Sequence, residues 1–146
     1  MQASALSDVG STRSKNEDAY WCDVPRGVFI VADGIGSQQA GEVASTAAVE
    51  VISAELTLAV DRGLRESELA DAMFDAFRES AEEIYNRAKE SEQLSGMACS
   101  AIAAVVMDGY CHGGLFFRSW QKRKNSEVSK GKGNQTLRNA QWWNCT

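Results

Sequence analysis

Three acidic residues near the N-terminus have the types and spacing of a catalytic or metal-binding group. Glu17 and Asp18 open one predicted strand, and Asp33 ends the next predicted strand. Neighbouring strands lie about 4.8 Å apart, so the three carboxylates converge at one end of the sheet if the two strands pair. Three hard oxygen donors in one place suit Mg²⁺ or Mn²⁺, with water in the remaining octahedral positions.

Two further residues fit the same kind of site. Gly34 follows Asp33, and the absence of a side chain lets its carbonyl oxygen approach an ion as a ligand. Arg13 lies in the turn-rich stretch before the acids, and its guanidinium can hold a phosphate through two hydrogen bonds. Each of these residues alone is also typical of a turn, and Asp108-Gly109 is interpreted as a turn only. The combination indicates a site for metal and phosphate.

The hydrophobic pattern predicts the elements that position these residues. The run from Val28 to Ala32 is continuously apolar, which indicates a strand buried on both faces. A helical pair follows this run, and Asp108-Gly109 between two apolar runs indicates a tight hairpin. The order predicts an α+β domain in which two helices cover one face of a mostly antiparallel sheet. Strands are predicted over 19–24, 28–32, 99–107 and 110–117, and helices over 39–60 and 66–89.

Composition excludes several classes of protein. The chain has 146 residues, of which 44% are hydrophobic and 24% charged, so it is globular rather than disordered. We expect no membrane-spanning helix and no signal peptide, which makes the cytoplasm the expected location. The single histidine, His112, excludes a histidine-based triad or a multi-histidine metal site. The four cysteines have no CxxC spacing and are interpreted as small apolar side chains.

The charge is distributed unevenly along the chain. Residues 1–117 contain 8 Lys/Arg against 19 Asp/Glu, a net charge of −11, whereas residues 118–146 carry 7 Lys/Arg and one acid, a net of +6. The second segment lacks helical or strand periodicity, so we predict a domain over 1–117 and a disordered basic tail over 118–146. Nucleic-acid binding by this tail, with stacking on Trp120, Trp142 and Trp143, is an alternative that we do not favour.

Two stretches of the chain together resemble a known family. They are Asp8-Val-Gly-Ser-Thr-Arg13-Ser-Lys-Asn-Glu17-Asp18 and the sequence VFIVADGIGSQQAGEVAS that begins at Val28. They closely resemble the opening motifs of bacterial metal-dependent protein phosphatases, the PPM or type 2C family, and Gly96-Met-Ala-Cys-Ser100 is similar to a degraded Gly-x-Thr-Thr motif. The resemblance covers about residues 6–112 and implies part of an α-β-β-α sandwich with a two-metal centre.

The resemblance also implies an activity and a role for each candidate residue. The family hydrolyses phosphoserine and phosphothreonine in proteins, opposite a Ser/Thr kinase, with a water activated by two ions of Mg²⁺ or Mn²⁺. By position, Glu17 and Asp18 serve the metals directly or through water, and Asp33 bridges them. The Gly34 carbonyl binds one ion, and Arg13 holds the substrate phosphate.

Several departures from the family pattern accompany the resemblance. Ile35, Ser37 and Gln38 replace family residues in the second motif, and no aspartate follows Asp108, although the family uses two later aspartates. About half of the family domain is therefore absent, and the abrupt change to a basic tail suggests a frameshift or premature end of the coding sequence. The alternative function is a non-catalytic, phosphatase-like regulatory module or an inactive truncated product.

Overall fold

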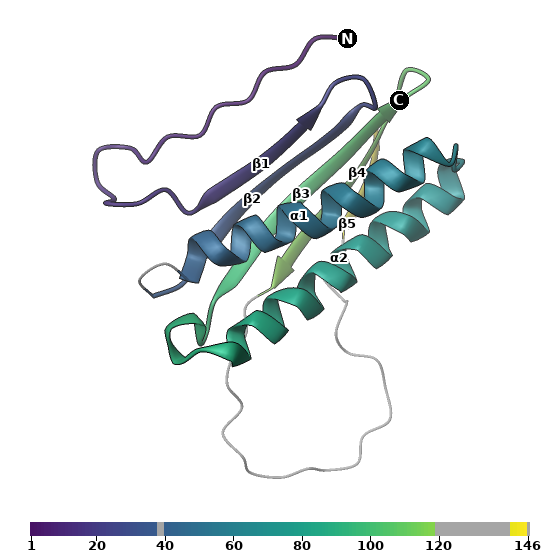
Figure 1. Ribbon diagram of the computed structural model, residues 1–146. Coiled ribbons are helices and arrows are strands. Elements are labelled where there is room, and N and C mark those ends of the chain that lie inside the picture. Colours follow the sequence, from purple (N-terminus) through teal and green to yellow (C-terminus); the bar gives the residue numbers. More distant parts are fainter. Residues whose placement is uncertain (38–39, 119–140, 146) are drawn as a thin grey trace, which may run out of the picture.

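A single antiparallel sheet with two helices on one of its faces forms the fold (Figure 1). The computed structural model describes residues 1–37, 40–118 and 141–145. The strand order in the sheet is β1-β2-β3-β4-β5, so each strand pairs with its neighbour in the chain. This arrangement confirms the predicted α+β layering. In chain order the elements are β1 (Asp18–Asp23), β2 (Val28–Ile35), α1 (Ala40–Asp61), α2 (Glu66–Glu90), the short 3₁₀ helix η1 (Glu92–Leu94), β3 (Ala98–Met107), β4 (Tyr110–Arg118) and β5 (Gln141–Cys145).

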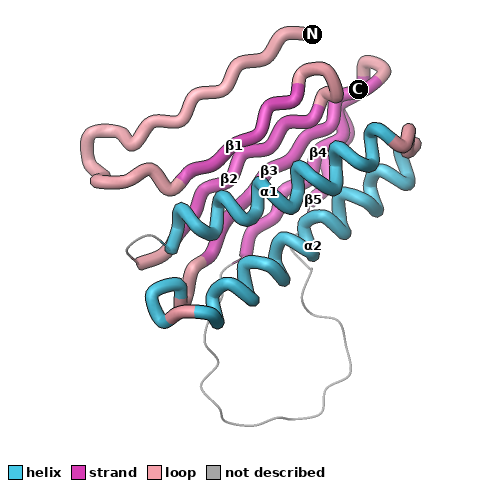
Figure 2. The backbone as a smooth tube through the Cα atoms, viewed as in Figure 1, coloured by secondary structure: helices cyan, strands magenta, loops and turns pink. Residues whose placement is uncertain are grey.

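Strand β2 has one face toward the helices and one face away from them. Val28, Ile30 and Ala32 are at most 4% exposed and belong to the core, whereas Val31 between them is 53% exposed. The expectation that this strand is buried on both faces is therefore wrong. Among the described residues, both helices lie on the same side of the sheet, and we call the other side the open face (Figure 2).

Helix α1 packs against the sheet through a stripe of small residues. Ala40, Ala44, Ala47 and Ala48 are fully buried, and such short side chains allow the helix axis to lie close to the strands. By length and composition alone α1 could cross a membrane, but half of its apolar window is buried inside the fold. Its apolar character is accounted for by this packing against the sheet and α2.

Helix α2 covers the rest of the same face. Its predicted stripe is buried at Leu69, Met73 and Phe77, and its charged side faces outward. The Arg87 guanidinium donates to Glu83 on its own helix at 2.7 Å and to Glu50 on α1 at 3.2 Å. The two helices are therefore joined by an apolar seam and by one ion pair at its border.

The β3–β4 connection is the hairpin that the sequence predicts. Asp108 and Gly109 both have positive φ angles, 52° and 83°, which suit the two central positions of a type I′ turn. Val105 and His112 pair across this hairpin, as do Met107 and Tyr110. Asp108-Gly109 is thus a turn, as interpreted from the sequence.

Strand β5 corrects the description of the basic tail. We expected no strand anywhere in residues 118–146, but Gln141–Cys145 pairs antiparallel with β4, with Leu115 opposite Gln141 and Cys111 opposite Cys145. Without β5, the outer edge of β4 would present unpaired backbone groups, and two consecutive tryptophans favour extended structure. Residues 119–140, on which the rest of the prediction depends, lie outside the described residues.

Candidate metal and phosphate site

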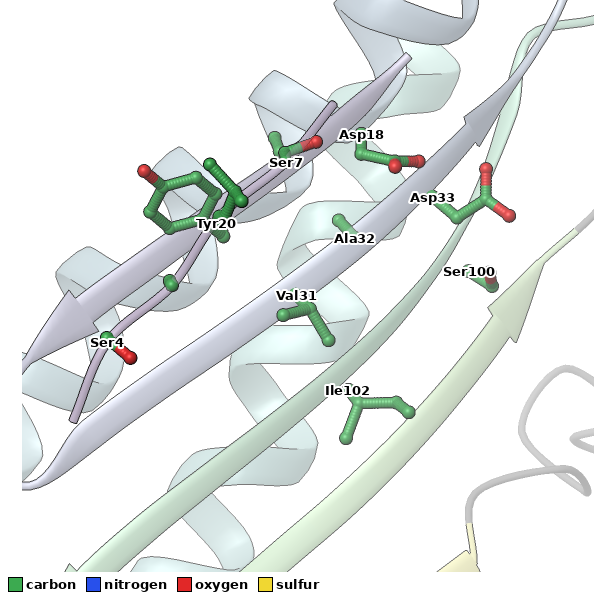
Figure 3. Close-up of a pocket in the computed structure, with 12 residues that line it drawn as sticks. Ser4, Ser7, Asp18, Tyr20, Val31, Ala32, Asp33, Ser100 and Ile102 are labelled. Atoms are coloured by element: carbon green, nitrogen blue, oxygen red, sulfur yellow. The ribbon is translucent and has the colours of Figure 1, made fainter. Parts of the chain in front are cut away.

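Asp18 and Asp33 lie directly opposite each other on β1 and β2 (Figure 3). The backbone N–H of Gly34 donates to the Glu17 carbonyl at 3.0 Å, which makes Glu17–Gly34 a hydrogen-bonded pair of the ladder. Asp18–Asp33 is then the adjacent non-hydrogen-bonded pair. In such a pair the Cα atoms are about 4.5 Å apart, and the two side chains lie closer together than in a hydrogen-bonded pair. The predicted meeting of these two carboxylates is confirmed by the strand register.

The position of Asp33 within its strand differs from the expectation. We expected Asp33 to end the strand, but β2 continues to Ile35 because β3 offers pairing partners as far as Ala98. Asp33 therefore has a strand on each side, with Asp18 on β1 and Ser100 on β3 as its cross-strand neighbours. Figure 3 shows the three polar side chains in a row across the sheet.

Ser100 was not identified as a site residue from the sequence. Its signal was the short Gly96-Met-Ala-Cys-Ser100 motif, which indicates its position in the chain but not its partner. The register places Ser100 opposite Asp33, on the open face of the sheet. Ser100 carries the one side-chain hydroxyl of β3.

The three polar residues border a cavity on the open face. The cavity has a volume of about 550 Å³ and is enclosed on one side by residues 4–7 of the N-terminal segment, which runs along β1. Its polar end is formed by Asp18, Asp33 and Ser100. The remainder of its wall on the sheet is apolar and includes Tyr20, Val31 and Ile102.

Glu17 does not join the two aspartates. Its carboxylate lies against Gly41 in the first turn of α1, on the side of the sheet that carries the helices. Successive side chains of a strand point to opposite faces, which separates Glu17 from Asp18. The expected convergence of three carboxylates is therefore wrong, and among the described residues no three His, Cys, Asp or Glu side chains form a group that could hold a metal ion.

The loop before β1 is organised by Asn16, a second residue that the sequence analysis did not single out. The Asn16 side-chain amide donates to the Ser7 hydroxyl at 2.7 Å, and its carbonyl oxygen accepts from the Asp18 backbone N–H at 3.0 Å. The second contact is the local hydrogen bond by which asparagine forms an Asx turn. An asparagine two residues before the first acid of a strand is the sequence signal for this turn.

Arg13 lies in this loop and is exposed. Within the part of the chain that the structure describes, its guanidinium forms neither an ion pair nor a hydrogen bond. A positively charged fork without a protein partner has all of its donors free for an anion. Its role toward phosphate stays a prediction, as does the metal-binding role of the Gly34 carbonyl.

The electrostatics around the carboxylate pair are uncompensated. None of the ion pairs among the described residues includes Asp18 or Asp33, whereas Asp23 at the other end of β1 is paired with Arg26 at 3.1 Å. Behind Asp33, burial raises the pKa of the Cys99 thiol to about 12, and the Asp33 charge adds to this shift. Two opposed carboxylates without a protein counter-ion suit a hard cation.

Comparisons with known proteins agree with this geometry. The family model described as protein phosphatase 2C matches residues 11–116. The serine/threonine phosphatase stp of Listeria innocua is 32% identical over 109 residues, which cover 73% of this chain and 43% of that protein. The chain therefore spans less than half the length of this curated relative.

Solved structures show the same partial coverage. The serine/threonine phosphatase PstP/Ppp of Mycobacterium tuberculosis superposes with a TM-score of 0.64 at 27% identity, over 76% of this chain and 44% of that one. The catalytic domain of PstP in complex with two manganese ions gives a TM-score of 0.64 at 24% identity, over 75% and 45% of the two chains. The matched region contains the first motif from Ser11 onward, the whole second motif and the opposed aspartates, and the chain belongs to the protein phosphatase 2C family.

Proposed function

We propose that this chain forms part of the active site of a metal-dependent phosphatase that acts on phosphoserine and phosphothreonine in proteins. The observation that carries the proposal is the direct opposition of Asp18 and Asp33 on neighbouring strands. Family membership supports the reaction class. The substrates are then phosphorylated proteins, and a Ser/Thr kinase is the opposing activity.

The donor set fits a divalent cation of the Mg²⁺ or Mn²⁺ type. Asp18 and Asp33 supply carboxylate oxygens from adjacent strands, and the Gly34 carbonyl follows Asp33 directly. In this proposal Asp33 would serve both ions, and Asp18 and Glu17 would act directly or through water. Two such ions, when bound, lower the pKa of a shared water and balance charge on the phosphoryl oxygens.

Arg13 is the residue that we propose for holding the substrate phosphate. Its free guanidinium presents paired N–H donors whose spacing matches two phosphate oxygens. Asn16 fixes the end of the loop by bonding both Ser7 and the Asp18 backbone, so the loop and the carboxylate pair are mechanically connected. Arg13 would orient the phosphoryl group, and Asp33 would hold the ions beside it.

The chain alone supplies only part of the charge that two cations need. Two divalent ions held close together repel each other, and ionised carboxylates must offset this repulsion. Asp18 and Asp33 are the two carboxylates that meet, and no aspartate follows Asp108 in the sequence. We therefore propose that the chain by itself is a weak phosphatase.

The experiment is turnover of an aryl phosphate at saturating Mn²⁺, measured for the chain and for Asp33→Ala and Arg13→Ala. The expected result is slow, Mn²⁺-dependent turnover that Asp33→Ala removes and that Arg13→Ala weakens mainly through a higher KM. Turnover no faster than that of Asp33→Ala would contradict a catalytic role for this chain and favour the non-catalytic regulatory module.

A further inference from the structure

Three glycines meet where β2 leads into α1, and close packing explains all three. Gly34, Gly36 and Gly41 are absent from the residues with positive φ, so backbone conformation does not require glycine there. A Cβ at Gly34 would collide with the carbonyl oxygen of Gly41, and a Cβ at Gly36 would lie 2.6 Å from the Ala40 Cβ. In both cases the obstacle is backbone or a short, fixed side chain.

Gly41 differs from the other two in what it faces. A Cβ at Gly41 would lie 2.6 Å from both Cδ and Oε1 of Glu17 and 3.1 Å from its Oε2. The obstacle is the carboxylate at the end of a flexible side chain, which can move at little cost. An alanine at this position would therefore displace the Glu17 carboxylate and leave the helix in place.

We propose that Gly41 is a positioning residue that holds the Glu17 carboxylate against α1, on the helix side of the sheet, one residue before Asp18 of the candidate metal site. The missing side chain at Gly41 forms a slot for this carboxylate in the first turn of α1, where the helix dipole favours negative charge. The Glu17 backbone is fixed at the same time, because its carbonyl accepts from the Gly34 N–H at 3.0 Å. With both ends of Glu17 held, its carboxylate has a defined position relative to Asp18, the next residue in the chain.

This inference rests on the proposed function, because the role of Glu17 toward a cation is part of that proposal. The first test is a calorimetric titration with Mn²⁺. It compares the complete wild-type chain with Gly41→Ala, Glu17→Gln and the double variant. If Gly41 acts through Glu17, Gly41→Ala weakens Mn²⁺ binding at least threefold, and the double variant binds no more weakly than Glu17→Gln alone. Thr46→Ala, at an exposed position of the same helix, is the matched control and should bind like the wild type.

Two results of the titration would overturn the inference. One is unchanged binding by Gly41→Ala, and the other is a double variant in which the two losses multiply. If the wild-type chain itself bound no Mn²⁺, the proposed metal chemistry would fail, and the slot would be judged by the second test alone.

The second test uses thermal unfolding in the presence of a chelator. Alanine has a higher helix propensity than glycine, so Gly41→Ala should raise the melting temperature when no carboxylate blocks the slot. The expected result is a larger rise in the Glu17→Ala background than in the wild-type background. Equal shifts in the two backgrounds would show that Gly41 and Glu17 are not coupled, and would overturn the inference whatever the titration gives.

Discussion

The Asp18–Asp33 pair places two negative charges opposite each other without a protein counter-ion. Like charges directly opposite on neighbouring strands destabilise a sheet, and the cation binding that we propose would restore the stability lost here. Under this proposal the metal-bound state of the fold would be favoured over the metal-free state.

A first prediction concerns the stability of the metal-free chain. In the presence of a chelator, Asp33→Asn should raise the free energy of unfolding by roughly 0.5 kcal/mol, because it removes the repulsion with Asp18. Added Mg²⁺ should then stabilise the wild type more than the variant, as thermal unfolding can show. Asp108→Asn, at the other Asp-Gly pair, is the control and should leave the Mg²⁺ response intact; a variant less stable than the wild type in chelator would contradict the prediction.

A second prediction at the residue scale follows from Cys99, which is 1% exposed and lies opposite Gly34, the residue next to Asp33. Burial raises the pKa of its thiol from 9.0 to about 12, so the folded chain keeps this proton while the unfolded chain releases it above pH 9. Stability should therefore fall as the pH rises from 9 toward 12, because the unfolded state binds fewer protons.

The measurement is urea unfolding of the wild type and of Cys99→Ala at several pH values in this range. Other groups titrate in both proteins, so the difference between the two curves isolates the thiol. Cys99→Ala is less stable than the wild type at neutral pH because the substitution leaves a cavity. The difference in unfolding free energy between the two proteins should narrow as the pH rises. A constant gap would show that the Cys99 pKa is not raised.

At the scale of elements, the approach of α1 to β2 depends on Gly34. A methyl group there meets backbone atoms of α1 and the Glu17 carbonyl, which would be 2.8 Å away, so neither neighbour can yield alone. We expect Gly34→Ala to destabilise the fold by about 2–3 kcal/mol, in the range of overpacked cores. Chemical denaturation checks this, and Gly41→Ala, which meets only a mobile carboxylate, should show no such loss of stability. Equal stability of Gly34→Ala and the wild type would contradict the packing at this junction.

The elements were predictable because their signals are local. The helix predicted over 39–60 is observed as Ala40–Asp61, and the Asp108-Gly109 turn sets the register of its hairpin by its own geometry. The two-sided burial of β2 was wrong because an apolar run records side-chain type and not what covers each face. Strand β5 was missed because its pairing with β4 joins segments that are far apart in the sequence.

The candidate site, like the elements, was predictable where its signals are local. Asp18 and Asp33 meet because the turn between β1 and β2 fixes their register, so a short-range pattern contains the information. The sequence put Glu17 on the wrong side of the sheet. Its side follows from the alternation of side chains along β1, which begins at Asp18, whereas the sequence pattern began this strand one residue later. Ser100 required the register of a strand that returns after both helices, which no local pattern gives.

At the scale of the whole molecule, the open face of the sheet is apolar and accessible. Tyr20, Val31, Ile35 and Ile102 are between 45% and 54% exposed on this side. Contiguous apolar surface of this kind promotes association in water. We therefore predict that the chain alone associates with itself in a concentration-dependent way.

Sedimentation velocity over a range of concentrations tests this prediction. Ile102→Lys places a charge in the middle of the open face and should shift the distribution toward the monomer, whereas Leu58→Lys, at an exposed apolar position on α1, should not. A wild-type chain that stays monomeric at all concentrations would contradict it. The result bears on the metal site as well, because Asp18 and Asp33 border the same face.

The opposed aspartates of β1 and β2 are proposed to bind a divalent cation. Calorimetric titration of the chain with Mn²⁺ tests this most directly, with Asp33→Asn as the disrupted site and Asp108→Asn as the matched Asp-Gly control. We expect saturable binding by the wild type and by Asp108→Asn, and a loss of at least tenfold in affinity for Asp33→Asn. Equal Mn²⁺ binding by all three proteins would contradict it, since Asp33 would then be no more than a strand residue.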